Sequence, residues 1–468
     1  MPELLTSRIA CRVEADSAAV AVVDRRDAVS YGELWDRVQR TAAAMGGMRR
    51  VAVLPTSDVG SIVAVAAAMH SGVSVVLLHR HLLPVQFARI MELAAPNVVL
   101  AEPNQHRRLS RLGCANPVAF LDESGHPHMA ATPQSELLVG VTSGTTGEPK
   151  LFVRSQRSWA RTLDRSDAIF DIRPGDRVST PGVLDHTHFL YGALHALTRG
   201  ATVDLRPAAD ALESEATHLY SVPTIAWDIV RSGIGPVTSV REVLSSAARW
   251  PTSGRVALQE VLPTASLTHF YGASELSFVS YDRGVEPSAG ILFDGVEAQI
   301  RDGVVHVRSD MLFDGYLTDM GIQSGPVDGW MTVGDRGSIE GRELTLFGRD
   351  SDTLIRAGLN VELAPIEAAA LDISGVVDAA AIALPDARMG QAPALALVVD
   401  AHAPSTAEIR RHLRTVLPAP SMPSSIRVLD ALPRTPRGKI DRQALGATFA
   451  TERTDPSTTN HSVREPLS

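Results

Sequence analysis

Two residue types are scarce in this 468-residue chain, and each scarcity narrows the class of protein. The two cysteines, Cys11 and Cys114, are too few for a disulfide framework and indicate a reducing compartment. Lysine is equally rare: of 44 Lys and Arg residues two are lysines, which leaves 42 arginines. A formal net charge of −9 gives no support for nucleic-acid binding. We therefore expect a cytoplasmic protein without a nucleic-acid partner.

The chain also lacks an unbroken apolar run that could span a membrane. Ser61–Leu78 comes nearest to the ~20 residues that a bilayer requires, but a His-Ser-Gly triplet at 70–72 interrupts it. A buried helix at Ile62–Met69 followed by a buried strand at Val73–Leu78 explains this segment better. The N-terminus has no charged segment followed by an apolar one, so we expect no signal peptide.

Short apolar runs alternate with helical patterns in the first third of the chain, and this alternation predicts the fold class. Ser30-Tyr-Gly-Glu33 is a capping-box pattern that begins a helix extending to Met45. Continuous apolar strands separated by helices indicate an α/β fold in which helices cover parallel sheets on both faces. From Gly290 to Leu346 the pattern changes to short strands with glycine turns, which predicts a β-rich subdomain.

The rest of the chain predicts a second, smaller domain after a hinge. We expect residues 1–348 to form the N-terminal domain, 349–352 the hinge and 353–447 a small α+β C-terminal domain. Residues 448–468 are polar and rich in Ser, Thr and Pro, so we expect them to be disordered.

Both lysines lie in Gly- and Pro-containing motifs. A strand at Leu137–Val141 leads into Thr142-Ser-Gly-Thr-Thr-Gly-Glu-Pro-Lys150, where glycines allow backbone N–H groups to converge on an anion and hydroxyls add donors. This is not the NTPase P-loop, which has another spacing, and a hydroxyl-rich surface loop is the alternative. The second lysine, Lys439, lies in Leu432–Asp441. Since lysine is a compact point charge, its survival in these two motifs predicts phosphate chemistry.

Five motifs in a fixed order give the chain a resemblance to a known family. They are Thr142–Lys150, Tyr271-Gly-Ala-Ser-Glu275, Thr332-Val-Gly-Asp335, the stretch from Gly348-Arg349 to Glu367, and Pro433–Arg442. In this respect the chain resembles the adenylate-forming superfamily of acyl-CoA synthetases, peptide-synthetase adenylation domains and luciferases, over roughly residues 18 to 446. The resemblance implies an enzyme that joins a carboxylate to the α-phosphate of ATP and releases pyrophosphate.

The resemblance also implies roles for single residues. Lys439 would be the catalytic residue, which bridges the carboxylate and the α-phosphate as charge develops. Glu275, with Thr142, would hold Mg²⁺, and Asp335 would accept hydrogen bonds from the ribose, with Arg349 nearby. The other residues that it implies for ATP and AMP are Thr142, Ser143, Gly144, Thr145, Thr146 and Lys150 at the phosphates, and Ser246, Ala247, Tyr271, Gly272, Ala273 and Ser274 around the adenine.

Two positions bear on domain switching and on the acyl acceptor. Ser351 stands at the hinge where the family usually has Asp or Lys, which puts efficient rotation of the C-terminal domain in doubt. Gly358 keeps the glycine beside which the family's pantetheine arm passes.

The resemblance implies a substrate pocket built from His186, Thr187, Tyr191 and Tyr220. Thr187 stands where amino-acid-activating members usually have an Asp that binds the substrate ammonium. Asp185 lies two residues earlier, but we expect a substrate other than an α-amino acid.

The histidines in this region allow a different interpretation. His186, His188 and His195 could instead hold a metal ion, if a carboxylate or water completed the shell.

We therefore expect ATP- and Mg²⁺-dependent conversion of an aryl or short to medium acyl acid to its adenylate. Transfer to the thiol of CoA, or to the phosphopantetheine of an acyl carrier protein, would follow. Two alternatives remain open: an amide synthetase that passes the acyl group to an amine, and a catalytically silent homologue that binds a nucleotide or acyl group.

Overall fold

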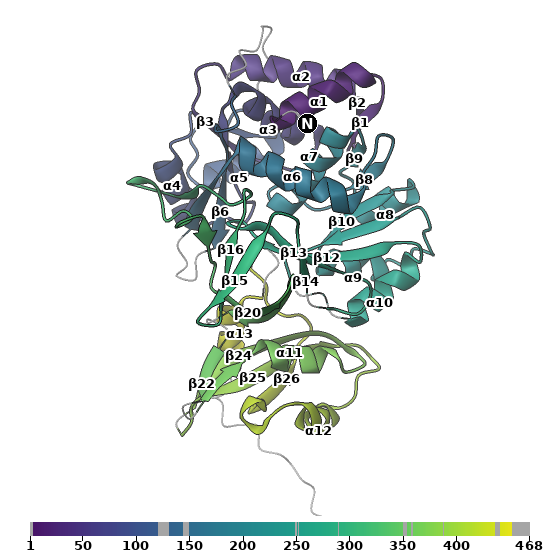
Figure 1. The fold of residues 1–468 in the computed structure, drawn as a ribbon, viewed down its shortest axis with the longest axis vertical. Helices are drawn as coiled ribbons and strands as arrows, with labels where there is room; N and C mark the ends of the chain where they lie inside the picture. The colour runs from purple at the N-terminus through teal and green to yellow at the C-terminus, as the bar shows by residue number, and fades with distance from the viewer. Residues whose placement is uncertain are drawn as a thin grey trace, which may run out of the picture. The chain divides into compact units, whose positions relative to one another are not determined.

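The computed structural model describes residues 3–119, 131–143, 149–248, 250, 252–288, 290–349, 353–356, 359–386, 388–435 and 440–451. The chain divides into two compact units, Met1–Leu346 and Phe347–Ser468, which we describe separately (Figure 1). The boundary between the units falls two residues before the end of the predicted N-terminal domain at residue 348.

Helices alternate with strands through most of the first unit, and α11, α12 and α13 belong to the second unit. The helices are α1 (Leu5–Ala15), α2 (Tyr31–Ala44), α3 (Val59–Ser71), α4 (Pro84–Ala94), α5 (His106–Arg111), α6 (Gln156–Phe170), α7 (Thr187–Arg199), α8 (Ala208–Glu213), α9 (Pro223–Arg231), α10 (Thr252–Val261), α11 (Ala364–Leu371), α12 (Thr406–Val416) and α13 (Arg442–Thr451), with 3₁₀ segments η1 (Pro103–Gln105) and η3 (Ala419–Ser421).

The two longest strands, β24 with 11 residues and β25 with 10, belong to the second unit. They are β1 (Val20–Val23), β2 (Ala28–Ser30), β3 (Arg50–Leu54), β4 (Ser74–Leu77), β5 (Val98–Ala101), β6 (Glu136–Ser143), β7 (Pro149–Ser155), β8 (Arg177–Ser179), β9 (Thr202–Asp204), β10 (His218–Ser221), β11 (Glu242–Ser245), β12 (Ser266–Ala273), β13 (Ser277–Arg283), β14 (Gly290–Leu292), β15 (Glu297–Arg301), β16 (Val304–Arg308), β17 (Gly315–Thr318), β18 (Gly321–Gln323), β19 (Trp330–Met331), β20 (Asp335–Glu340), β21 (Glu343–Arg349), β22 (Thr353–Arg356), β23 (Leu359–Glu362), β24 (Val376–Asp386), β25 (Gly390–Val399) and β26 (Ser425–Val428).

Two large sheets form the first unit, and each has a parallel part, as the sequence predicted. The first has the order β15-β16-β20-β21-β14-β13-β12-β11-β10-β8-β9-β1-β2, with β1 and β8 to β12 parallel. The second has the order β18-β17-β7-β6-β4-β3-β5, with β3 to β6 parallel. The buried strands read as continuous apolar runs because helices cover them.

The glycine-rich stretch from Gly290 to Leu346 does consist of short strands, and they extend both sheets. Strands β14 to β16 and β19 to β21 continue the first sheet beyond β13, while β17 and β18 join the second sheet through β7. Short strands need partners for their backbone N–H and C=O groups, and the edges of the existing sheets supply them.

Local sequence signals account for several helix ends. Ser30 and Glu33 form the predicted capping box, and α2 begins at the next residue after Ser30. Gly72 adopts a left-handed conformation, with φ of 71°, and ends α3 just after the predicted apolar run. Helix α1 was not predicted; it buries Leu5 and Ile9.

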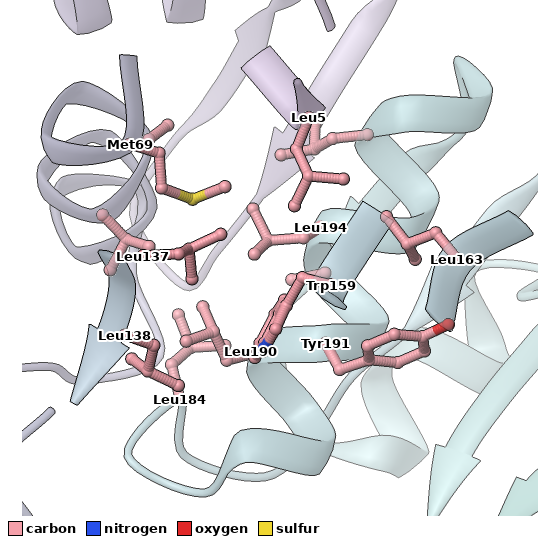
Figure 2. Close-up of a cluster of buried hydrophobic side chains, with 14 of the residues drawn as sticks. Leu5, Met69, Leu137, Leu138, Trp159, Leu163, Leu184, Leu190, Tyr191 and Leu194 are labelled. Carbon is pink, nitrogen blue, oxygen red and sulfur yellow. The ribbon is translucent and has the colours of Figure 1, made fainter. Parts of the chain in front are cut away.

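A buried apolar cluster surrounds α7 and holds the elements of the first unit together. Figure 2 shows side chains from α1, α3, β6, α6 and α7 meeting in this cluster. Those labelled are Leu5, Met69, Leu137, Leu138, Trp159, Leu163, Leu184, Leu190, Tyr191 and Leu194. Helix α7 therefore packs against side chains of α1, α3, β6 and α6 at once. This close packing fixes where the first turn of α7 can lie.

The second unit is an α+β domain with its own core. Its sheet has the order β23-β22-β25-β24, with β26 parallel to β25. Apolar residues of α11 and α12 pack on it, including the buried Ile366, Ile409 and Leu413. Within the parts of the chain that the structure describes, no helix has the length and apolarity needed to cross a bilayer.

Gly192 on α7 gives a test of this packing. An added Cβ would lie 2.6 Å from the ring of Tyr220, which is fully buried and cannot move aside. We expect Gly192→Ala to lower the free energy of unfolding by up to about 2 kcal/mol, because an overpacking cost of about 1–3 kcal/mol outweighs the ~1 kcal/mol gain in helix propensity.

Denaturant unfolding of this variant measures the effect, and Gly235→Ala is the matched control. Nothing lies within 4 Å of a Cβ at Gly235, so that variant should stay within about 0.5 kcal/mol of the parent chain. Equal stability of the two variants would contradict the tight packing at Gly192.

Candidate active site

The two ends of the motif Thr142–Lys150 belong to β6 and β7. These strands pair antiparallel, with Thr142 opposite Lys150. Lys150 is exposed, and its Nζ lies 5.5 Å from the centroid of the Tyr316 ring. An ammonium at this distance from an aromatic face is attracted by the ring quadrupole.

The motif that begins at Tyr271 occupies the end of β12 and the turn that follows it. Gly272 has no room for a side chain, because a Cβ would lie 2.2 Å from the carbonyl oxygen of Ser277. The glycine therefore allows β12 to turn back as β13 within a few residues. Glu275 lies in that turn with 8% of its surface exposed, and its Oε1 accepts a hydrogen bond of 2.8 Å from the Tyr316 hydroxyl.

A buried guanidinium supports this turn from inside the unit. Arg154 on β7 is 5% exposed; its Nη1 donates to the carbonyl of Ser274 at 3.3 Å and its Nη2 to that of Met311 at 2.8 Å. Burial lowers the pKa of Arg154 to about 10, against the opposing effect of Asp314 and Glu275. Arg154 stays protonated at neutral pH, so a fixed positive charge lies near Glu275.

A hydrogen bond joins two motifs that are far apart in the chain. The hydroxyl of Tyr271 donates to Oδ2 of Asp335, 64 residues away. Asp335 is the first residue of β20 and is 8% exposed. The residues predicted for the adenine and for the ribose are therefore brought together.

The turn after β11 lies beside the Tyr271 motif. Ser246 donates from Oγ to the carbonyl of Phe270 at 2.9 Å, one residue before Tyr271. Ala247 has a φ of +74°, a left-handed conformation that is uncommon for a residue with a side chain. Such backbone strain is concentrated at functional turns, which fits the predicted adenine side.

His186 and Thr187 begin α7. His186 is the N-cap of this helix, and its Nδ1 accepts from the backbone N–H of His188 at 3.3 Å. With Nδ1 as acceptor, a neutral His186 carries its proton on Nε2. Both His186 and Thr187 are half-buried.

Asp185 has structural partners. Its side chain is fully buried and accepts from the backbone N–H of Arg80 at 3.0 Å and from the Arg80 guanidinium at 3.1 Å. The Asp185 carboxylate is thus paired with Arg80, and a substrate other than an α-amino acid stays a prediction.

The two predicted pocket tyrosines are buried in this structure. Tyr191 is 5% exposed and its hydroxyl lies 2.5 Å from Ser166 Oγ. Tyr220 is fully buried; its hydroxyl lies 2.9 Å from Nδ1 of His195, whose Nε2 lies 2.8 Å from Asp167. Tyr191 is a buried residue of α7 and Tyr220 a buried residue of β10, and contact with a substrate stays a prediction for both.

The alternative of a histidine metal site finds no support in these contacts. Both ring nitrogens of His195 have partners, and Nε2 of His188 lies 2.8 Å from the carbonyl of Ser221. Among the described residues, no group of three or more His, Cys, Asp or Glu is arranged to hold a metal ion. For Mg²⁺, which takes one or two carboxylates together with phosphate and water oxygens, the carboxylate of Glu275 is a suitable donor.

Several predicted site residues cannot be placed. Those outside the described residues are Gly144, Thr145, Thr146, Ser351, Gly358 and Lys439. For Thr142, Ser143 and Arg349 the description covers the backbone and not the side chain.

His188 makes the stability of the chain depend on pH. Burial lowers the pKa of His188 to about 4, whereas an unfolded histidine has a pKa of about 6.5. Between these values the unfolded chain binds a proton that the folded chain does not, so stability falls as the pH is lowered from 6.5 to 4. His188→Gln keeps an N–H donor for the Ser221 carbonyl and removes the titration.

We expect this variant to lose about 2 kcal/mol less unfolding free energy than the parent between pH 7 and pH 5. Urea unfolding at a series of pH values measures the difference. An unchanged pH dependence would show that His188 is protonated in the folded chain.

The fold and the assembled motifs define an enzyme of the adenylate-forming class. The chain belongs to the AMP-binding enzyme family: the model of that family matches residues 10–317, and the model of the AMP-binding enzyme C-terminal domain matches residues 365–439.

Several curated proteins are similar in sequence. An uncharacterized acyl–CoA ligase of Bacillus subtilis, YhfT, is 29% identical over 94% of this chain and 97% of its own length. VraA of Staphylococcus epidermidis, provisionally named as a long chain fatty acid–CoA ligase, is 30% identical over 68% of this chain and 72% of its own.

Solved structures confirm the fold. MatB from Rhodopseudomonas palustris with bound ATP superposes with a TM-score of 0.86 at 22% identity, over 97% of this chain and all of that one. The amide bond synthetase McbA from Marinactinospora thermotolerans has a TM-score of 0.82 at 25% identity, over 95% of this chain and 99% of its own.

Proposed function

We propose that this chain is an AMP-forming acid–thiol ligase, which activates a carboxylic acid with ATP and transfers the acyl group to CoA. The observation that carries the proposal is that residues from separate family motifs contact one another, directly or through Tyr316, in the first unit. The Tyr271 hydroxyl binds Asp335, and Tyr316 contacts both Lys150 and Glu275. Full-length similarity to an acyl–CoA ligase supports the same activity.

The chemistry has two steps. In the first, a carboxylate oxygen attacks the α-phosphorus of ATP, an acyl-adenylate forms and pyrophosphate leaves. In the second, a thiolate attacks the acyl carbon and AMP leaves. Lys439 is the residue we propose for the first step, because an ammonium stabilises the charge shared by the two reacting anions.

The nucleotide would be held by residues of the family motifs. Lys150 and the loop before it would contact the outer phosphates, and Glu275 would supply a carboxylate to Mg²⁺. Asp335 would accept from the ribose hydroxyls, and Tyr271 would flank the adenine with the turn at Ser246.

The proposal also names the class of acid and the acceptor of the acyl group. We propose an aryl or short to medium acyl acid, with His186 and Thr187 at its pocket. VraA is named for long-chain acids, so the experiments must include them. CoA is the proposed thiol, and an acyl carrier protein is the alternative. We further propose a cytoplasmic location, in keeping with the unpaired Cys11 and Cys114.

Acid-dependent exchange of pyrophosphate into ATP tests the first step. We expect one class in a panel of aryl, aliphatic and amino acids to support exchange. Lys439→Ala should reduce the rate about 10²–10³-fold, the usual effect of removing a group that stabilises developing charge. Arg411→Ala, which removes an exposed cation from α12, should leave the rate within about twofold.

The absence of exchange with every acid, under conditions where ATP binds, would overturn the assignment and favour a binding protein without catalysis. Full exchange by Lys439→Ala would overturn the role proposed for Lys439 and leave the ligase assignment in place. Thioester formation from presynthesised acyl-adenylate should survive in this variant, because the lysine is proposed for the adenylation step.

The similarity to McbA makes amide formation the second candidate. With the active acid, ATP and equal concentrations of CoA and an amine, we expect mass spectrometry to show the acyl-CoA thioester as the main product. An amide as the main product, with CoA untouched, would instead assign the chain as an amide synthetase.

A further inference from the structure

Tyr316 lies between two residues that we have proposed for the nucleotide, and sequence reasoning had not selected it. It belongs to β17, which pairs antiparallel with β7; Tyr316 lies opposite Phe152, two residues along from Lys150. Strand β17 therefore runs beside β7, whose second residue is Lys150.

Two contacts of this tyrosine involve candidate site residues. The hydroxyl donates to Oε1 of Glu275 at 2.8 Å, and Nζ of Lys150 lies 5.5 Å from the centroid of the ring. Glu275 and Lys150 are 125 positions apart in the sequence, and one side chain connects them.

The ring of Tyr316 has a fixed support. Phe313, 2% exposed, meets it edge to face with centroids 5.0 Å apart at 75°. The backbone N–H of Phe313 also donates to the carbonyl of Glu275 at 3.0 Å. The segment that carries Tyr316 thus holds both the backbone and the carboxylate of Glu275.

We propose that Tyr316 is a positioning residue for metal–nucleotide binding, and this inference rests on the proposed function. Its hydroxyl orients the Glu275 carboxylate by occupying one lone pair of Oε1, which leaves the remaining lone pairs of the group for a cation. Its ring supports the Lys150 ammonium, which we propose contacts the outer phosphates. Tyr316 itself contacts neither nucleotide nor acid in this role.

Two variants separate these contributions. Tyr316→Phe keeps the ring and removes the hydrogen bond to Glu275, while Tyr316→Leu removes both contacts. Tyr281→Phe is the matched control, because Tyr281 is also half-buried and has a cation in reach, Arg283, at 5.8 Å from its ring.

Calorimetric binding of ATP at a series of Mg²⁺ concentrations, without any acid, is the first measurement. We expect Tyr316→Phe to raise the Mg²⁺ concentration for half-maximal ATP binding about tenfold, since the carboxylate loses a charge-assisted hydrogen bond. Metal-free ATP binding should change less than about twofold. Tyr316→Leu should also weaken metal-free ATP binding, about threefold, because Lys150 loses its support.

Pyrophosphate exchange over the same series of Mg²⁺ concentrations, with the active acid added, then reports on catalysis. The KM for the acid should stay unchanged in both variants while the Mg²⁺ requirement rises. Tyr281→Phe should match the parent in every measurement.

Three outcomes separate the hypotheses. If both Tyr316 variants lower the melting temperature but keep the parent's Mg²⁺ and ATP dependence, Tyr316 is structural and the inference is overturned. If the acid KM rises and the Mg²⁺ dependence does not, Tyr316 acts elsewhere and the inference is again overturned. If the parent binds Mg²⁺ and ATP but never exchanges pyrophosphate, the proposed function fails, and the binding series still decides the role of Tyr316.

Discussion

The candidate site depends most on the hydrogen bonds that the buried guanidinium of Arg154 donates to the backbone. A charge with 5% exposure is expensive to desolvate unless its donors are satisfied and an opposite charge is near. Its donors reach the carbonyl oxygens of Ser274 and Met311, and Asp314 and Glu275 oppose its deprotonation. One side chain on β7 thereby fixes the turn after β12 and the segment before β17. The geometry of Glu275 and of Tyr316 follows from those two anchors.

Close backbone approach is the second constraint, and it explains which residue types the motifs require. Gly272 lets β12 double back with the Ser277 carbonyl 2.2 Å from where a Cβ would be. Ser277 takes a φ of +61° on the other side of the same turn, and its Oγ lies 2.7 Å from Thr162 Oγ1. The turn is therefore held by hydrogen bonds to α6 as well as by Arg154. A carboxylate displayed on so fixed a turn has little conformational entropy left to lose on binding a cation.

Much of this arrangement could be predicted from the sequence, because the relevant signals are local. The capping box at Ser30 and the glycine at Gly72 gave helix ends that agree with the structure. The motifs containing Tyr271 and Asp335 were predicted to share one ligand, and a hydrogen bond now joins them. Arg154 and Tyr316 could not be found in this way, since each acts through partners more than 40 positions away. Arginine is common in this chain, and Tyr316 follows a glycine in a short strand, so neither carries a local signature.

The scarcity of lysine gains a physical explanation at Lys150. Many described arginines are held in ion pairs, as Arg50 is with Glu136 at 2.6 Å and Arg8 with Asp164 at 2.8 Å. Such planar, multiply bonded contacts suit permanent structure. Lys150 lies over the ring of Tyr316, a contact worth about 0.5–1 kcal/mol at an exposed site. In the proposed function Lys150 contacts the outer phosphates of ATP. A compact ammonium on a flexible stem suits that role, because its three donors can turn toward phosphate oxygens, whereas a guanidinium presents its donors in a fixed planar fork.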